Sequence, residues 1–294
     1  MKALRFCLFG WLIICSVAAQ ADSILVVLPG RSALTDEFVD ALRAQRSNDD
    51  IVVHQLTDPL PPAPASLVVT LGLRGLEWRL EQPWDTPTIA TYVSRSSLNT
   101  LPADTFDQNI HVLLANPPPL RQLRLAKLLV PRARSVGLLH SSRYAEQIPE
   151  WRQAAAQVSF NLNLRILPNQ DSLARQLVEL LDQNEVLVAA DDPEVYNADN
   201  LKTILLTSYT RNKVLIGPSA PFVNAGSLSS TFSSPTQTAL SLGRLIDGPW
   251  QGNTLSYPHY FSVLSNPQVA RSLGFPPPND QALAAELERQ EAGQ

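Results

Sequence analysis

Two adjacent carboxylates, Asp191 and Asp192, follow the apolar run Val186–Ala190 at the point where a predicted strand ends. A helix is expected after Pro193, followed by a second apolar strand, Val214–Gly217, and by a loop rich in Ser, Pro and Gly. In open α/β sheets, ligands bind beyond the carboxyl ends of the strands. The two carboxylates therefore stand where they could hold an ammonium group of a bound solute.

Each carboxylate also has a structural interpretation. Asp192 precedes Pro193 and Glu194, an arrangement typical of a helix N-cap, and we favour that role over ligand contact. Asp191 has no such local task, so ligand contact and a solvated turn stay open as alternatives. Carboxylates that are neighbours in sequence are poorly placed to flank a substrate on opposite sides, so the pair does not indicate a hydrolytic site.

Other candidate ligand contacts lie at the ends of further predicted strands or just after them. In the first half of the chain they are Arg31, Ser32, Gly72, Arg74, Tyr92, Ser94 and Arg95. In the second half they are Ser141, Ser142, Tyr144, Ser219 and Phe222. Guanidinium and hydroxyl groups of the first half could bind a carboxylate, and the aromatic rings could form apolar walls. Together with the carboxylates of the second half, these residues predict a zwitterionic ligand.

The same residues also have simpler interpretations. Each arginine, taken singly, is more typical of a solvated loop charge. Ser142 is more typical of a helix cap than of a ligand contact. What favours a binding site is the position that all of these residues share, at the carboxyl ends of predicted strands.

Patterns typical of catalysis or metal binding are scarce. No two of the four histidines (His54, His111, His140 and His259) have the spacing of metal ligands. The sequence also lacks a Gly-x-Ser-x-Gly elbow and a Walker loop. We therefore expect neither enzymatic activity nor a metal or other cofactor.

The N-terminus has the pattern of a secretory signal peptide. Lys2 and Arg5 precede the apolar segment Phe6–Val17, which is too short to span a membrane, and Ala19–Ala21 is typical of a cleavage site. We expect residues 1–21 to be removed and the product to be periplasmic. Both cysteines fall inside this segment, so the mature chain would contain no thiol.

The charge of the chain argues against nucleic acid as a partner. The formal net charge is −4 over the whole sequence, and it becomes −6 when Lys2 and Arg5 are removed with the signal peptide. The sequence also has no basic stripe of the kind that binds phosphates.

The chain alternates between short apolar runs and helical patterns. The runs expected to be strands are Ile24–Leu28, Ile51–Gln55, Leu67–Leu71, Thr88–Val93, His111–Ala115, Ser135–His140, Asn163–Leu167, Val186–Ala190 and Val214–Gly217. Continuous apolar runs separated by helices favour mainly parallel sheets that are covered on both faces. The segment Ser234–Gln237 has the pattern of a capping box with proline at the first helical position, and it predicts a helix to about Ile246.

Three prolines after Asn116 mark the expected boundary between two lobes, because they end a strand and similar β-α blocks lie on either side. We expect a first lobe of residues 22–117 and a second lobe of residues 118–229. Residues 230–252 and 268–294 are expected to return to the first lobe. The predicted fold class is α/β, with a mainly parallel sheet in each lobe and a ligand cleft between them.

Several segments of the second half carry a resemblance to one family. They are Val136–Ser142, Val186–Pro193, Val214–Ser219, Phe222–Leu228 and Asn266–Phe275, within residues 110–278. They resemble the periplasmic substrate-binding proteins of ABC importers, in the tryptophan/tyrosine-type branch. The first half departs from the family by a proline-rich loop at residues 59–64, where a helix is expected, and by the lack of a Gly/Asn-rich stretch near residues 99–110.

The resemblance implies a type I two-lobed binding fold that closes on its ligand by hinge motion. We therefore expect a monomer that captures a small ligand, such as an amino acid or a related zwitterion, and delivers it to an ABC permease in the inner membrane. A periplasmic module that signals to a receptor or kinase stays open as an alternative. A periplasmic hydrolase is a third alternative, although no nucleophile or metal set supports it.

Overall fold

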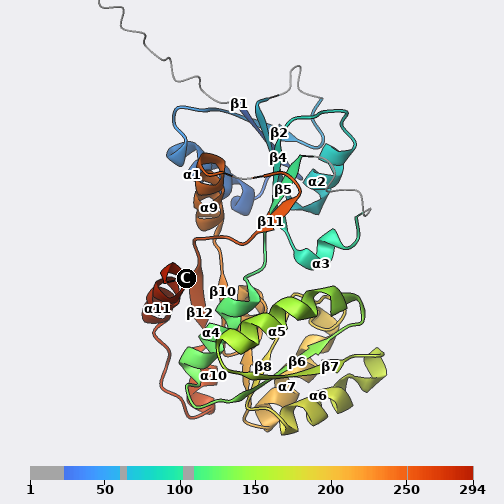
Figure 1. Ribbon diagram of the computed structural model, residues 1–294, viewed down its shortest axis with the longest axis vertical. Coiled ribbons are helices and arrows are strands. Elements are labelled where there is room, and N and C mark those ends of the chain that lie inside the picture. Colours follow the sequence, from blue (N-terminus) through green and yellow to red (C-terminus); the bar gives the residue numbers. More distant parts are fainter. Residues whose placement is uncertain (1–22, 60–64, 102–108, 250, 294) are drawn as a thin grey trace, which may run out of the picture.

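The structure is a computed structural model, and it describes residues 23–59, 65–101, 109–249 and 251–293. The expected signal peptide lies outside these residues. Within them, the strands form two mainly parallel six-stranded sheets, each flanked by helices. Figure 1 shows the sheets in two bodies along the long axis of the molecule, which we call the first (upper) and second (lower) lobe.

The sheet of the first lobe has the strand order β11-β5-β4-β3-β1-β2. These strands are β1 (Ser23–Leu28), β2 (Asp50–Gln55), β3 (Leu67–Leu71), β4 (Thr88–Val93), β5 (Ile110–Leu114) and β11 (Thr254–Ser256). All of their described pairings are parallel. Helices α1 (Ala33–Gln45) and α9 (Pro235–Asp247) share a core with one face of the sheet, and α2 (Gly72–Leu80) shares a core with strand residues of β4 and β5.

The sheet of the second lobe has the strand order β12-β10-β9-β8-β6-β7. These strands are β6 (Ser135–His140), β7 (Asn161–Ile166), β8 (Val186–Val188), β9 (Val214–Ile216), β10 (Ser229–Phe232) and β12 (Ser262–Ser265). The edge strand β12 is antiparallel to β10, and the other described pairings are parallel. The helices between the strands are α4 (Pro119–Leu129), α5 (Ile148–Gln157), α6 (Leu173–Asp182), α7 (Ala198–Thr210) and α8 (Ala220–Ala225).

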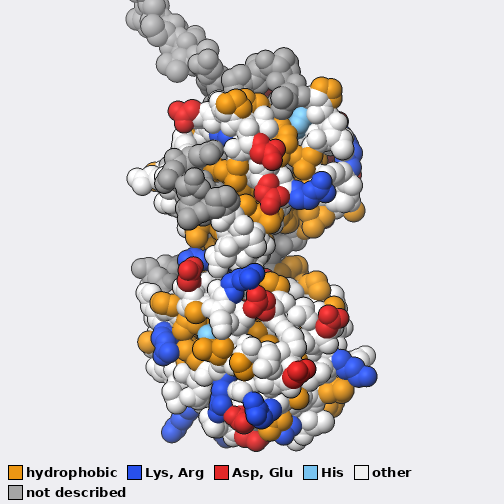
Figure 2. All heavy atoms as spheres, turned by 90° about the vertical axis from the view of Figure 1, so that its right-hand side faces the viewer, with side chains coloured by type: hydrophobic (Ala, Val, Ile, Leu, Met, Phe, Trp, Pro, Cys, Tyr) orange, Lys and Arg blue, Asp and Glu red, His pale blue; other side chains and the backbone are white. Residues whose placement is uncertain are grey.

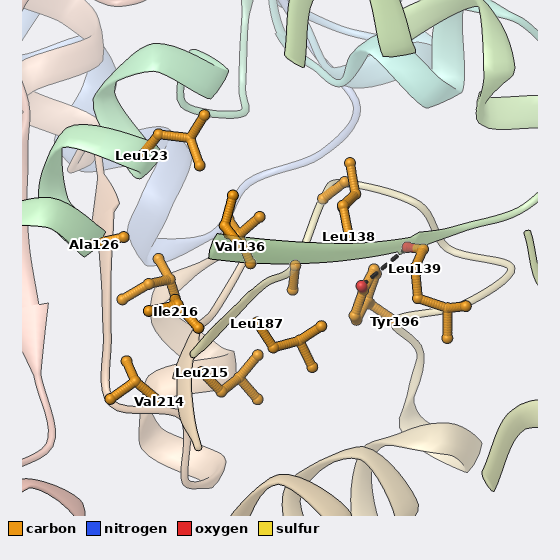
Figure 3. Packing of buried hydrophobic residues seen from close by; sticks show 14 of the residues in the cluster. Leu123, Ala126, Val136, Leu138, Leu139, Leu187, Tyr196, Val214, Leu215 and Ile216 are labelled. Carbon is orange, nitrogen blue, oxygen red and sulfur yellow. Dashed lines mark hydrogen bonds between the residues drawn. The ribbon is translucent and has the colours of Figure 1, made fainter. Parts of the chain in front are cut away.

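The core of the second lobe forms because its strands are short apolar runs covered on both faces. Leu138, Leu187 and Ile216 are fully buried together with residues of the flanking helices (Figure 3). The Tyr196 hydroxyl is paired within this cluster, because it donates to the backbone oxygen of Leu139 at 3.0 Å (Figure 3). A well-packed core gives the loops at the strand ends a fixed base.

Three segments of the described chain connect the two lobes: residues 115–118, 233–234 and 257–261. Through them α9 and β11 belong to the first lobe, while β10 and β12 belong to the second (Figure 1).

Helices α10 (Pro267–Ser272) and α11 (Asp280–Ala292) lie against the second lobe, which differs from the expected return of residues 268–294 to the first lobe. The reason is that their apolar residues, such as Ala270 and Leu287, are buried in the core of the second lobe. Residues 230–252 were also expected to return to the first lobe. Helix α9 does so, but residues 230–232 belong to β10, which pairs with β9 and β12 in the second lobe.

Helix α11 is tied to α4 by an ion pair between the buried Arg121 and the half-buried Glu291. The guanidinium of Arg121 donates to both carboxylate oxygens of Glu291, at 2.7 and 2.8 Å, and to the backbone oxygen of Pro258 at 3.1 Å. It also lies over the ring of Phe261, 3.8 Å from the centroid. The last helix is thereby bonded next to the connecting segment 257–261.

The helix predicted from the capping box at Ser234 is present as α9. The Ser234 hydroxyl accepts from the backbone N–H of Gln237, and the Gln237 side chain accepts from the backbone N–H of Ser234. None of the helices in the described ranges has the length and apolar character needed to cross a membrane.

Candidate ligand-binding site

Asp192 ties together the tips of two neighbouring strands in the second lobe. Its carboxylate is buried and accepts from the backbone N–H of Ser141, after β6, at 2.6 Å, and from that of Glu194 at 3.2 Å. Burial raises the pKa of Asp192 above its usual value, although these hydrogen bonds act to lower it. The carboxylate therefore shapes the loop in which it lies.

The expected helix after Asp192 is a turn instead. Helix α7 begins later, at Ala198, because the Asn197 side chain accepts from the backbone N–H of Asn200 and caps it there. Asp192 satisfies a backbone N–H two residues ahead, as a cap does, but the segment that it caps is the turn at residues 193–196. This is the local Asx geometry that aspartate favours in turns.

Asp191 makes a contact between the two lobes. Its Oδ2 accepts from the hydroxyl of Ser96 at 2.9 Å, and Ser96 lies in α3 (Arg95–Leu98) of the first lobe. Figure 1 shows α3 at the lower side of the first lobe, facing the second. The strand tips of the two lobes therefore meet at this pair.

A second polar contact joins the lobes near Glu150 of α5. The hydroxyl of Tyr257, in the connecting segment 257–261, donates to Glu150 Oε1 at 2.7 Å. Arg95 of α3 lies 3.8 Å from Glu150 Oε2. Figure 2 shows the narrow waist between the lobes, with side chains of both charges on the rim of the lower lobe.

Two hollows lie at this junction. The larger has a volume of about 150 Å³, and the first lobe contributes Leu73, Ser96, Ser97, Asn99 and Thr100 to its lining. The second lobe contributes Ser141, Arg143, Tyr144, Gln147, Asp192, Pro193 and Glu194. This hollow is therefore bounded by both lobes, at the carboxyl ends of both sheets, as is typical of ligand sites in such folds.

The smaller hollow adjoins the larger one. It has a volume of about 10 Å³, room for about one water molecule. Its wall includes Glu150 and Asp191, whereas Tyr144 and Gln147 line both hollows. Since Ser96 lines the larger hollow and Asp191 the smaller, their hydrogen bond runs between the two spaces.

Four of the residues selected from the sequence line these hollows: Ser141, Tyr144, Asp191 and Asp192. The Tyr144 hydroxyl accepts from Trp151 Nε1 at 3.0 Å, which fixes the ring in the wall. Trp151 itself is buried and also lines the smaller hollow.

The first-lobe arginines lie outside both linings. Arg31 is exposed and lies 3.8 Å from Asp36, and Arg74 is exposed on α2. Long charged side chains at the starts of helices remain solvated unless a partner holds them. No guanidinium of the first lobe therefore lines the described hollows, which weakens the expectation of a carboxylate-binding side.

The remaining first-lobe residues have structural roles in the described chain. The hydroxyls of Ser32 and Ser94 cap α1 and α3, by accepting from the backbone N–H groups of Thr35 and Ser97. Gly72 begins α2 with a φ of 74°, a left-handed conformation that favours glycine.

Tyr92 packs inside the first lobe. Its ring meets Phe38 edge-on at 5.7 Å, and burial raises the pKa of its hydroxyl to about 12. Its φ is 56°, and the register of β4 with β5 shifts between Thr91 and Val93. This bulge turns the chain just before Ser94, so the tyrosine contributes to the shape of the tip.

The other second-lobe residues also lie outside both linings. Ser142 is exposed and its side chain caps nothing, because the hydroxyl of Ser141 accepts from the backbone N–H of Tyr144 instead. Ser219 precedes α8 without a side-chain bond, and Phe222 is buried with its ring edge-on to Tyr196 at 6.2 Å.

Sequence reasoning missed Gln147 and Glu150. With Tyr144 and Trp151 they recur at spacings of three and four residues, so that they face one side of the 3₁₀ turn η2 (Arg143–Gln147) and of α5. This spacing directly after a strand tip is the signal that could have found them. The described residues contain no group of three His, Cys, Asp or Glu side chains placed to hold a metal ion.

Solved structures share this architecture. The ligand-free, open structure of a substrate-binding protein with adhesive properties from Clostridium difficile matches with a TM-score of 0.66 at 13% identity, over 88% of this chain and 97% of that one. This chain has the type I periplasmic binding protein fold.

Two further solved structures match with lower TM-scores. An ABC domain from Streptococcus pneumonia in complex with L-Trp gives a TM-score of 0.52 at 15% identity, over 88% of this chain and 96% of that one. A conserved domain protein from Vibrio cholerae gives a TM-score of 0.53 at 15% identity, over 90% of this chain and 98% of that one. No family model matches the sequence, and no curated protein matches it significantly. At these identities the similarity shows the fold alone.

Proposed function

We propose that this chain is an exported solute-binding protein that captures a small ammonium-bearing ligand between its lobes and delivers it to an ABC permease. An amino acid or a related zwitterion belongs to this class. The observation that carries the proposal is the contact of Asp191 with Ser96, because it places a half-buried carboxylate from one lobe against a hydroxyl of the other. An ammonium ligand would replace Ser96 as a partner of Asp191 and bridge the lobes.

The same geometry supports closure by hinge motion. A ligand can shift the balance between open and closed states only if it binds one of them more tightly. A solute that touches the strand tips of both lobes binds the closed state more tightly, because the two tips meet only when the lobes are close. The three connecting segments leave rotation of the lobes as rigid bodies as the simplest motion.

The ligand can be identified directly. The mature protein is purified under gentle conditions, and any small molecule that it carries is released and identified by mass spectrometry. The protein is then tested by thermal shift against amino acids and small amines. A true ligand at about a hundred times its Kd adds about 2.7 kcal/mol of stability, or roughly 5–10 °C in Tm.

A matched variant separates specific from nonspecific binding. Asp191→Ala is expected to abolish the shift given by an ammonium-bearing ligand. If no solute changes the Tm of either protein and no molecule is carried through purification, the proposal is wrong.

A further inference from the structure

Gln147 has a hydrogen-bond donor with no partner. It ends the 3₁₀ turn η2, only 5% of the residue is exposed, and within the described residues its buried Nε2 meets no acceptor. A buried amide donor without a hydrogen-bond partner destabilises the folded state, so such groups are rare in native proteins. Where one occurs, it often has a functional role or a partner that binds there.

The position of this amide indicates where a partner would come from. Gln147 lines both the larger and the smaller hollow, next to Tyr144. Any molecule that occupies the junction of the two hollows lies beside its side chain. The donor is thus left unpaired at the wall of the candidate ligand site.

The charges around Gln147 restrict what the acceptor can be. Glu150 and Asp191 line the smaller hollow, and no Lys or Arg lines it. In the larger hollow, the one cation among the lining residues is Arg143, which pairs with Glu194 at 3.3 Å. A ligand carboxylate held at Gln147 would therefore face carboxylates without a free cation, which is unfavourable. A neutral oxygen accepts the same hydrogen bond without that repulsion.

We propose that Gln147 Nε2 donates to a neutral oxygen, a carbonyl or hydroxyl, of a ligand whose ammonium group contacts Asp191. The inference rests on the proposed function and narrows its ligand class. The preferred solutes are amino-acid amides, amino alcohols and other amines with a neutral acceptor. Free amino acids bind more weakly than these, because their carboxylate meets the acidic wall.

Three matched probes test the inference. L-Leucinamide has an ammonium group and a neutral carbonyl, L-leucine replaces that carbonyl by a carboxylate, and isoamylamine has the ammonium group alone. Calorimetric titration is carried out at about pH 6.5, where α-amino groups are protonated. The expected order of affinity is leucinamide first, with leucine and isoamylamine both at least about tenfold weaker.

Substitution of Gln147 provides the second arm. Gln147→Met keeps the length of the side chain and removes the donor. It is therefore expected to weaken the binding of leucinamide about tenfold while leaving the affinity for isoamylamine unchanged. Gln147→Glu keeps the shape and is expected to weaken leucinamide likewise. Gln153→Met, at an exposed position of α5, serves as the control and should change neither probe.

The Tm of the unliganded protein separates a binding role from a structural one. Because Gln147→Met removes an unpaired buried donor, the unliganded protein should be as stable as before or more stable. A marked fall in its Tm would show a structural role and overturn the inference. The inference would also be overturned if leucine bound as tightly as leucinamide, if Gln147→Met lowered the affinity for all three probes equally, or if none of the three bound. The proposed function would survive each of these results if the purified protein carried another solute.

Discussion

Replacing Asp192 by Ala is expected to destabilise the second lobe at neutral pH. The carboxylate accepts from two backbone N–H groups, that of Ser141 at 2.6 Å and that of Glu194 at 3.2 Å. Ser141 is buried, so its N–H would be left unpaired at a cost of about 1–3 kcal/mol. Glu194 is exposed, so its N–H can turn to water and costs about 0.5–1.5 kcal/mol.

The net effect is smaller than the sum of these two costs. The substitution also removes a carboxylate whose burial is unfavourable, which offsets part of the loss. We therefore expect a net loss of about 2 kcal/mol, or a fall of about 4–8 °C in the Tm of a chain of this size. Urea unfolding followed by circular dichroism measures the free energy, and differential scanning fluorimetry measures the Tm.

Asp191→Ala is the matched control, because it removes the same charge one residue away. Asp191 is half-buried and bonded to a hydroxyl that can turn to water, so the loss should stay below about 1 kcal/mol. Ligand binding, in contrast, should be lost in this variant. If both variants are destabilised equally, or if Asp192→Ala leaves the Tm unchanged, the division of roles between the two carboxylates is refuted.

Further variants and conditions test other parts of the structure. Burial raises the pKa of Asp192 in the folded chain. The stabilisation that protonated Asp192 gives to the folded state is therefore complete below the unfolded pKa of about 4, and it is lost as the pH rises through the folded pKa. Urea unfolding at a series of pH values should show that the wild type gains stability on acidification relative to Asp192→Asn. Gly217→Ala should lower the Tm measured by fluorimetry, because its Cβ would lie 2.5 Å from Ser227 Oγ in a buried site. Glu291→Ala should cost about 2–4 kcal/mol in urea unfolding, because it leaves the buried guanidinium of Arg121 without its carboxylate, whereas Glu288→Ala should cost little.

Much of the fold could be predicted from the sequence, because most strands are apolar runs with helical patterns between them. The runs at Leu67–Leu71, Thr88–Val93 and Ser135–His140 have the observed bounds, and the other predicted strands differ by a few residues at their ends. Strands β10, β11 and β12 were missed. They are short and rich in Ser and Thr, and β10 is buried only because its neighbours satisfy its polar groups, such as the N–H of Thr231 bonded to Gln122.

The candidate site was less predictable, because strand tips reveal which loops face the cleft but not which side chains enter it. Arg31 and Asp191 both follow strands, yet the first lies outside the described hollows while the second reaches the other lobe. Local capping decides several such cases, since a hydroxyl that holds a helix start is already occupied. The Asp192 N-cap interpretation was close, because the carboxylate does accept a local N–H, although in a turn.

The three connections between the lobes also determine the order in which the chain can complete its structure. Helix α9 packs on α1 with Ala239 and Leu242 in the same core as Phe38, and β11 forms the outer strand beside β5. The first lobe therefore lacks a covering helix and an edge strand until residues 235–256 are available, and these residues follow β6 to β10 of the second lobe. A nascent chain that stops short of this point exposes apolar surface of its first lobe. We therefore expect the first lobe to complete its folding only after residues 235–256 have been synthesised.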